Sequence, residues 1–169
     1  MSATIRVRAA VPEDSMAIAA IYAPHVLNGV TSFEVEVPDS AEISRRRAGI
    51  LELGLPYLVA EIDGEFAGYA YAGQFRPRAA YRFTVENSVY VAERFQRRGV
   101  ARLLMQELIA QSASAGIRQM IAVIAEPSSS TASVMLHRSL GFEEVGVLRG
   151  VGEKFGRALD VLLMQRSLS

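Results

Sequence analysis

The feature of the sequence that most restricts its fold is a change of hydrophobic period near Gly99. Before it, residues 57–75 read as two strands around an Asp63-Gly64 turn, and residues 81–91 supply a third strand of an antiparallel meander. After it, apolar residues recur at helical spacing, and residues 120–124 form a short apolar run typical of a buried strand. A strand, helix and strand in this order require a crossover connection. We therefore expect antiparallel pairing to change to parallel pairing around this helix.

The remaining segments extend this pattern on both sides. They are a strand at 5–9, a helix from Pro12, a helix from a capping box at Asp39 to Gly54, a helix from Ser128–Ser130 to Gly141, and strands at 143–148 and 158–166. Taken in order, the elements predict an α/β (α+β) fold with a mixed, mostly antiparallel central sheet of about seven strands flanked by about four helices. The length suits a single domain over residues 1–169.

Composition narrows the possible chemistry. Eighteen basic residues balance eighteen acidic ones, and no apolar run is as long as a membrane span, so neither nucleic acid nor a membrane is an expected partner. The N-terminal segment from Met1 to Arg6 has no apolar signal region, which favours a cytoplasmic protein. With no cysteine and two histidines, we expect no metal site and no cysteine nucleophile. Carboxylates, hydroxyls, imidazole and backbone groups remain available for catalysis.

One part of the chain is strongly basic. Seven arginines and two glutamates lie between Arg76 and Arg102, which gives this segment a net charge of +5. A solvated basic rim is the ordinary interpretation of such a cluster. Here the cluster coincides with a glycine-containing loop, and this favours an anionic ligand.

That loop, Gln96 to Ala101, lies between a predicted strand and a predicted helix. Free backbone N–H groups and the positive end of the helix dipole converge at such a junction, and Gly99 lets an anion approach the backbone closely. The six-residue pattern alone is equally compatible with an ordinary strand-to-helix turn. The sequence around the loop has to distinguish an anion-binding loop from an ordinary turn.

Three stretches supply that context: T-V-E-N-S-V-Y-V at 84–91, S-V-M-L-H-R-S-L-G-F at 133–142, and V-G-E-K-F-G-R-A-L-D at 151–160. Together with the loop, they resemble the GNAT superfamily of N-acetyltransferases, and more closely its phosphinothricin and methionine sulfoximine N-acetyltransferase branch. The resemblance runs through nearly the whole chain. It implies a GNAT fold with acetyl-CoA as co-substrate and no metal.

The resemblance also assigns residues to the donor. It places the pantetheine arm of acetyl-CoA along Val89, Tyr90 and Val91. The pyrophosphate would be held by Arg97, Arg98, Gly99, Val100, Ala101 and Arg102. Ser130 stands where the family usually has an asparagine that contacts the cofactor, and a helix N-cap is the alternative interpretation of this serine.

Catalysis requires a base, because a protonated ammonium has no lone pair with which to attack a thioester. Glu86 is the best candidate if burial raises its pKa, although an outward-facing strand glutamate is the ordinary alternative. His137 is a second candidate acid or base, and a packed helix residue is the alternative. The absence of cysteine favours direct attack of the amine over an enzyme-linked thioester.

For the acceptor, the resemblance implicates Arg76, Pro77, Arg78, Asn87 and Ser88. A guanidinium can hold a carboxylate or phosphinate through two parallel hydrogen bonds. Phe33 and Lys154, in an early and a late loop, would close the pocket across a two-fold homodimer interface as in relatives. Core packing and solvation are the respective alternatives.

The expected activity is therefore acetyl transfer to the α-amine of a small amino-acid analogue such as phosphinothricin, methionine sulfoximine or methionine sulfone. An acetyltransferase for protein N-termini or polyamines is a second hypothesis. A non-catalytic acyl-CoA sensor is a third.

Overall fold

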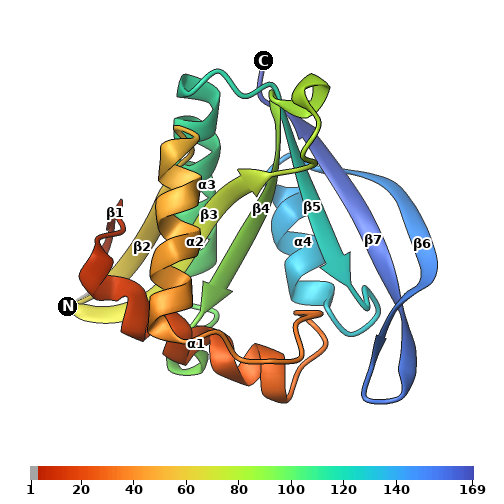
Figure 1. The fold of residues 1–169 in the computed structure, drawn as a ribbon, viewed down its shortest axis with the longest axis horizontal. Helices are drawn as coiled ribbons and strands as arrows, with labels where there is room; N and C mark the ends of the chain where they lie inside the picture. The colour runs from red at the N-terminus through yellow and green to blue at the C-terminus, as the bar shows by residue number, and fades with distance from the viewer. Residues whose placement is uncertain (1–3) are drawn as a thin grey trace.

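The computed structural model describes residues 4–169, which form one seven-stranded sheet and four α-helices (Figure 1). Met1, Ser2 and Ala3, which begin the segment compared with a signal peptide, lie outside the described residues. The strands are β1 (Ile5–Ala9), β2 (Tyr57–Ile62), β3 (Glu65–Gln74), β4 (Thr84–Val91), β5 (Gln119–Ala125), β6 (Glu143–Lys154) and β7 (Arg157–Ser167). The helices are α1 (Ser15–Leu27), α2 (Ser40–Glu52), α3 (Val100–Ser114) and α4 (Thr131–Ser139).

The strand order β1-β2-β3-β4-β5-β7-β6 confirms the predicted mixed sheet. Among the strands described, β4 and β5 pair in parallel and the other neighbours pair antiparallel. The parallel pair is joined by α3, which is the predicted crossover. The switch from antiparallel to parallel pairing thus lies at the centre of the sheet.

The strands β2, β3 and β4 send alternate side chains to two cores. On β2, Leu58 and Ala60 pack in the core beneath α3 and α4, whereas Tyr57 and Val59 pack in the core beneath α1 and α2. This follows from the two-residue period of a strand. The helices therefore cover both faces of the sheet, and a residue's position in a strand decides which pair of helices it meets.

The predicted hairpin turn is present. Asp63 and Gly64 both have positive φ, at 49° and 85°, as a two-residue type I′ turn requires. At the start of α2, the Asp39 carboxylate accepts a hydrogen bond from the Glu42 backbone N–H at 2.7 Å. The reciprocal half of the predicted capping box is not formed, because the Glu42 carboxylate accepts from Arg45 and Arg46 instead.

Predicted strand boundaries were wrong at two places in the chain. The third meander strand begins at Thr84 and not at residue 81, because Ala79–Tyr81 form a short 3-10 helix in the preceding loop. The last two strands are longer than predicted and meet at a tight turn of Phe155 and Gly156, both with positive φ. Lys154 is consequently the last residue of β6 and not part of a loop.

Among residues 4–169, no helix combines the length and the apolar character that crossing a membrane would require.

Candidate active site

A cleft opens where β4 and β5 separate. Their parallel pairing extends only from Thr84 to Glu86 on β4, opposite Gln119 to Ile121 on β5. At the next residue the side-chain amide of Asn87 donates a hydrogen bond to the Ile121 carbonyl at 3.2 Å. Beyond this bridge the strands diverge, with α4 seen between them in Figure 1. β4 stays paired with β3 up to Val91, so its other edge is open toward the cleft.

The cleft holds a cavity of about 580 Å³ that brings together many of the predicted site residues. These are Phe33, Glu86, Asn87, Ser88, Val89, Tyr90, Ser130 and His137. They come from the loop after α1, from β4, and from the start and body of α4. The cavity therefore spans the sheet from the α1 side to the α4 side.

Glu86 lies on the β4 wall of this cavity, half-buried, and faces the side of the sheet that carries α1 and α2. The face follows from alternation, since Tyr90 on the same side packs its ring 5.1 Å from that of Tyr22 of α1. Burial raises the pKa of Glu86 above its ordinary value, because desolvation disfavours the charged carboxylate. A raised pKa makes this carboxylate a stronger base than an exposed glutamate.

His137 lies on the opposite face and is 3% exposed. Its Nε2 atom is 2.9 Å from the Asn87 amide oxygen, and its Nδ1 atom is 2.8 Å from the Ser133 carbonyl oxygen. Burial lowers the pKa of His137. Both ring nitrogens face oxygen acceptors, and a neutral imidazole donates to only one of them at a time. The ring lies within hydrogen-bond distance of Asn87 at the point where the strands separate.

The predicted anion-binding loop has the geometry of a cradle. Arg97 and Gly99 both adopt positive φ, at 59° and 87°, and α3 begins directly after Gly99. Buried Phe95 anchors the loop, and the Arg98 guanidinium lies 5.4 Å from its ring centroid. This arrangement leaves the first N–H groups of α3 pointing out of the helix end, as an anion site requires.

Not all of the predicted donor residues point their side chains toward this cradle. Val100 is buried in the core, so only its backbone is available to a ligand. Arg102 donates instead to the Ser139 hydroxyl at 2.9 Å, at the far end of α4. Ser130 is at the N-cap position of α4, but its hydroxyl donates to the Ala125 carbonyl at 2.7 Å and forms no capping hydrogen bond.

The predicted acceptor arginines lie outside the cavity of this chain. Arg76, Pro77 and Arg78 are exposed in the loop between β3 and β4. Arg76 is held in place by stacking, with its guanidinium 5.1 Å from the Phe75 ring and 5.6 Å from the Tyr81 ring. The loop leads directly into β4, whose third residue is Glu86.

Lys154 is buried and hydrogen bonded to protein carbonyl groups, so the alternative interpretation of a solvated lysine was wrong. Sequence reasoning also missed a polar network beside the cavity. The Tyr22 hydroxyl lies 2.6 Å from the Ser32 hydroxyl and donates to Glu34 at 3.1 Å, and Glu34 accepts from Arg46 at 2.6 Å. The signal for it was weak, because these residues are spread over a helix, a loop and a second helix.

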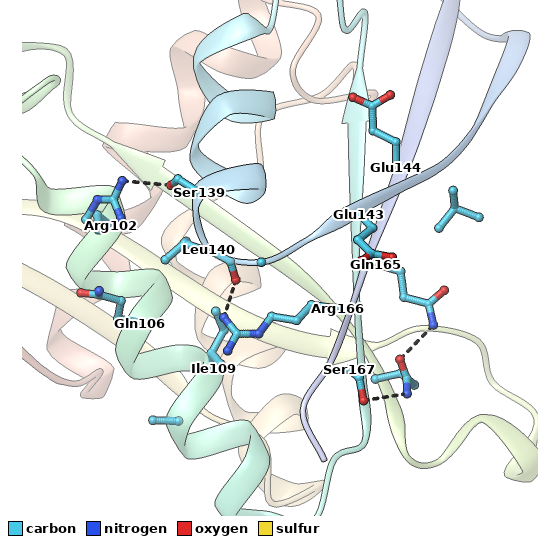
Figure 2. Close-up of a pocket in the computed structure, with 14 residues that line it drawn as sticks. Arg102, Gln106, Ile109, Ser139, Leu140, Glu143, Glu144, Gln165, Arg166 and Ser167 are labelled. Carbon is cyan, nitrogen blue, oxygen red and sulfur yellow. Dashed lines mark hydrogen bonds between the residues drawn. The ribbon is translucent and has the colours of Figure 1, made fainter.

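A larger cavity, of about 1,210 Å³, lies between α3, the end of α4 and the outer strands (Figure 2). Figure 2 shows that Arg102 donates a hydrogen bond to the Ser139 hydroxyl and that Arg166 donates one to the Leu140 carbonyl. Its lining is polar and contains neither Glu86 nor the open edge of β4. The smaller cavity is therefore the candidate reaction site, because it joins a base to an open strand edge.

Comparison with known proteins defines the class. The model of the acetyltransferase (GNAT) domain family matches residues 7–163. The chain belongs to the GNAT acetyltransferase family.

Individual relatives narrow the branch of the family. The chain is 51% identical over 163 residues to the phosphinothricin N-acetyltransferase of Alcaligenes faecalis, covering 96% of this chain and 82% of that one. It is 41% identical over 172 residues to the L-methionine sulfoximine/L-methionine sulfone acetyltransferase of Pseudomonas aeruginosa, covering 99% and 96%. It superposes on the Sinorhizobium meliloti phosphinothricin acetyltransferase in complex with acetyl-CoA with a TM-score of 0.92 at 44% identity, covering 100% and 90%.

Proposed function

We propose that this enzyme transfers the acetyl group of acetyl-CoA to the α-amine of a small amino-acid analogue of the phosphinothricin or methionine sulfoximine type. The observation that carries the proposal is the placement of Glu86, a carboxylate of raised pKa, in a cavity bounded by the open edge of β4. Relatives named for these two activities support the substrate class.

In the proposed reaction, Glu86 takes a proton from the substrate ammonium, directly or through water. The amine nitrogen then attacks the thioester carbonyl, a C–N bond forms, and the C–S bond breaks as the thiolate of coenzyme A leaves. The second proton of the attacking nitrogen passes to the departing thiolate or to solvent. A thiol has a pKa of about 8.5, so its thiolate leaves without a strong general acid. This fits a His137 whose ring nitrogens are already occupied, and we assign it the role of holding Asn87.

For the donor, the open edge of β4 at Val89 to Val91 offers backbone groups to the pantetheine arm. The cradle from Arg97 to Arg102 follows β4 along the chain and suits the pyrophosphate. Ser130, at the start of α4, offers a further polar group to the donor. Val89, Tyr90 and Ser130 line the cavity that contains Glu86.

For the acceptor, Arg76 and Arg78 offer guanidinium groups that are exposed beside the start of β4. Asn87 and Ser88 lie in the cavity itself, and Phe33 forms its wall on the α1 side. We assign recognition of the acceptor's carboxylate or phosphinate to the arginines, since a bidentate guanidinium suits these planar or branched anions.

The experiment that tests the function is a panel assay. Purified protein with acetyl-CoA should release free thiol with at least one of phosphinothricin, methionine sulfoximine and methionine sulfone. Polyamines and N-terminal peptides should give little release at the same concentration. Acetyl-CoA binding without thiol release across the whole panel would contradict the proposal and favour a sensor.

Arg78→Ala should raise the KM for the anionic amino acid by about tenfold, which corresponds to the loss of one charge-assisted hydrogen bond. The KM for acetyl-CoA should stay within about twofold, because Arg78 precedes the start of β4 and the donor loop follows its end. Arg118→Ala removes another exposed arginine, one outside the predicted acceptor set, and serves as the matched control. Equal effects of both variants would exclude a specific role for Arg78.

We further propose that the enzyme is a homodimer joined through β6. This strand is at the end of the sheet and exposes Val145, Val147, Leu148 and Val151 on its surface. An exposed apolar edge strand has unpaired backbone groups that can pair with a strand of another chain. Light scattering should show a dimer in solution, and Val145→Asp should shift it toward monomer while Val35→Asp, on an exposed loop, should not. A monomeric wild-type protein would contradict this.

A further inference from the structure

Lys154, the single lysine of the chain, is 5% exposed at the tip of the β6–β7 hairpin. Among the described residues, its ammonium donates to two carbonyl oxygens, that of Ser32 at 2.7 Å and that of His25 at 3.3 Å. Burial lowers the pKa of Lys154 below its ordinary value. Burying an ammonium on carbonyl groups costs free energy that a surface lysine avoids, so the position needs an explanation.

The two carbonyl groups belong to the end of α1 and to the loop that follows. His25 lies in the last turn of α1, where the helix dipole favours a cation. Ser32 lies in the loop between α1 and α2. Residues 29–38, all of which the structure describes, form no backbone–backbone hydrogen bond. This part of the loop therefore depends on side-chain contacts for its position, and Lys154 provides one of them.

The hairpin contacts the same loop at a second point, two residues earlier on β6. A Cβ atom built on Gly152 would lie 2.3 Å from Cε2 and 2.4 Å from Cζ of Phe33. The ring of Phe33 thus rests directly on the backbone of Gly152, which no larger residue would allow. Gly152 and Lys154 together attach the loop to the hairpin.

Both attached loop residues line the cavity that contains Glu86. Ser32 is buried against the Tyr22 hydroxyl at 2.6 Å, and Phe33 is part of the cavity wall. We propose that Lys154 is a positioning residue: by holding Ser32, and with Gly152 holding Phe33, it fixes the acceptor side of the cavity and so determines which amino-acid side chains fit. This positioning role rests on the proposed acetyl transfer. In it, Lys154 acts on the substrate through the loop and not by direct contact.

The first test is Lys154→Met, which keeps the unbranched stem and removes the hydrogen-bond donors. The KM for the acceptor should rise about tenfold, and the relative rates across the amino-acid panel should change. The KM for acetyl-CoA and kcat should stay within about twofold of wild type. A general loss of structure would raise both KM values or lower kcat, and would overturn the positioning role.

Gly152→Ala tests the second attachment independently. Its methyl group must displace the Phe33 ring, so the acceptor KM should again rise about tenfold. In a Phe33→Ala background the ring is absent, and Gly152→Ala should then change the acceptor KM by less than about twofold. Additive effects of the two substitutions would show that Gly152 does not act through Phe33.

A spectroscopic readout does not depend on turnover. The chain contains no tryptophan, so Phe33→Trp supplies a single tryptophan in the loop, which can be excited selectively over the six tyrosines. Adding Lys154→Met should shift its emission to longer wavelength and increase quenching by acrylamide, because the released loop exposes the ring. Unchanged emission would overturn the proposal whether or not the enzyme acetylates any member of the panel. A changed emission with an unchanged acceptor KM would show that the loop moves without determining specificity.

Discussion

Glu86→Gln should lower kcat by about a hundredfold to a thousandfold, which is the usual contribution of a positioned general base. Glutamine fills the same space on β4 and can accept a hydrogen bond, but it cannot take the ammonium proton at neutral pH. The KM for acetyl-CoA should stay within about twofold, because the donor cradle lies on a different segment. Steady-state kinetics with both substrates varied separates the two effects. Equal losses in turnover and in donor affinity would remove Glu86 from the role of base.

The pH dependence gives a second measurement on the same residue. Burial raises the pKa of Glu86, and only its deprotonated form is a base, so kcat should fall as pH falls through this raised pKa. The acidic limb of the profile should therefore lie above the range of an ordinary glutamate and should disappear in Glu86→Gln.

Stability provides the matched check. A carboxyl group whose pKa is higher in the folded protein than in the unfolded chain destabilises the fold once it is ionised. At neutral pH, Glu86→Gln should therefore leave Tm unchanged or raise it, which separates lost chemistry from lost folding. Glu52→Gln, at an exposed position of α2, should alter neither kcat nor Tm.

Gly99→Ala should raise the KM for acetyl-CoA at least tenfold and reduce the increase in Tm that acetyl-CoA produces. Gly99 has φ of 87°, where an alanine costs roughly 1–2 kcal/mol, and relief of that strain would reorient the N–H groups of the cradle. A Cβ atom there meets no protein atom within 4 Å, so crowding by protein neighbours contributes nothing to the effect.

Gly116→Ala is a closely matched control for this prediction. Gly116 follows the other end of α3, has φ of 84°, and likewise has open space around its Cβ position. The two variants should lose similar stability in thermal unfolding of the free protein, and only Gly99→Ala should lose donor affinity. Equal donor affinity in the two variants would contradict an anion site at Gly99.

Local pattern was enough to predict the elements of this fold. The turn at Asp63 and Gly64, the helix that begins after Gly99 and the apolar strand after it each depend on residues within one or two turns of the chain. The parallel crossover followed, because a strand, helix and strand in sequence leave few other arrangements. The errors fell at element ends, where the 3-10 turn at Ala79 and the tight turn at Phe155 decided the boundaries.

The sequence by itself thus determined the order of elements and the position of a glycine-containing loop before a helix, both of which depend on period and local backbone conformation. The resemblance to the GNAT family made that loop a candidate anion site and Glu86 a candidate base. Only the tertiary structure decided that Glu86 and His137 lie on opposite faces of β4, and that Arg76 and Arg78 lie outside the cavity. It also decided that Lys154 is buried against the loop of Ser32. The physical reason is that these relations depend on where β4 and β5 stop pairing and on how far the β6–β7 hairpin reaches. Both are set by packing between segments that are distant in the sequence. Lys154 and Ser32, for example, are more than a hundred residues apart.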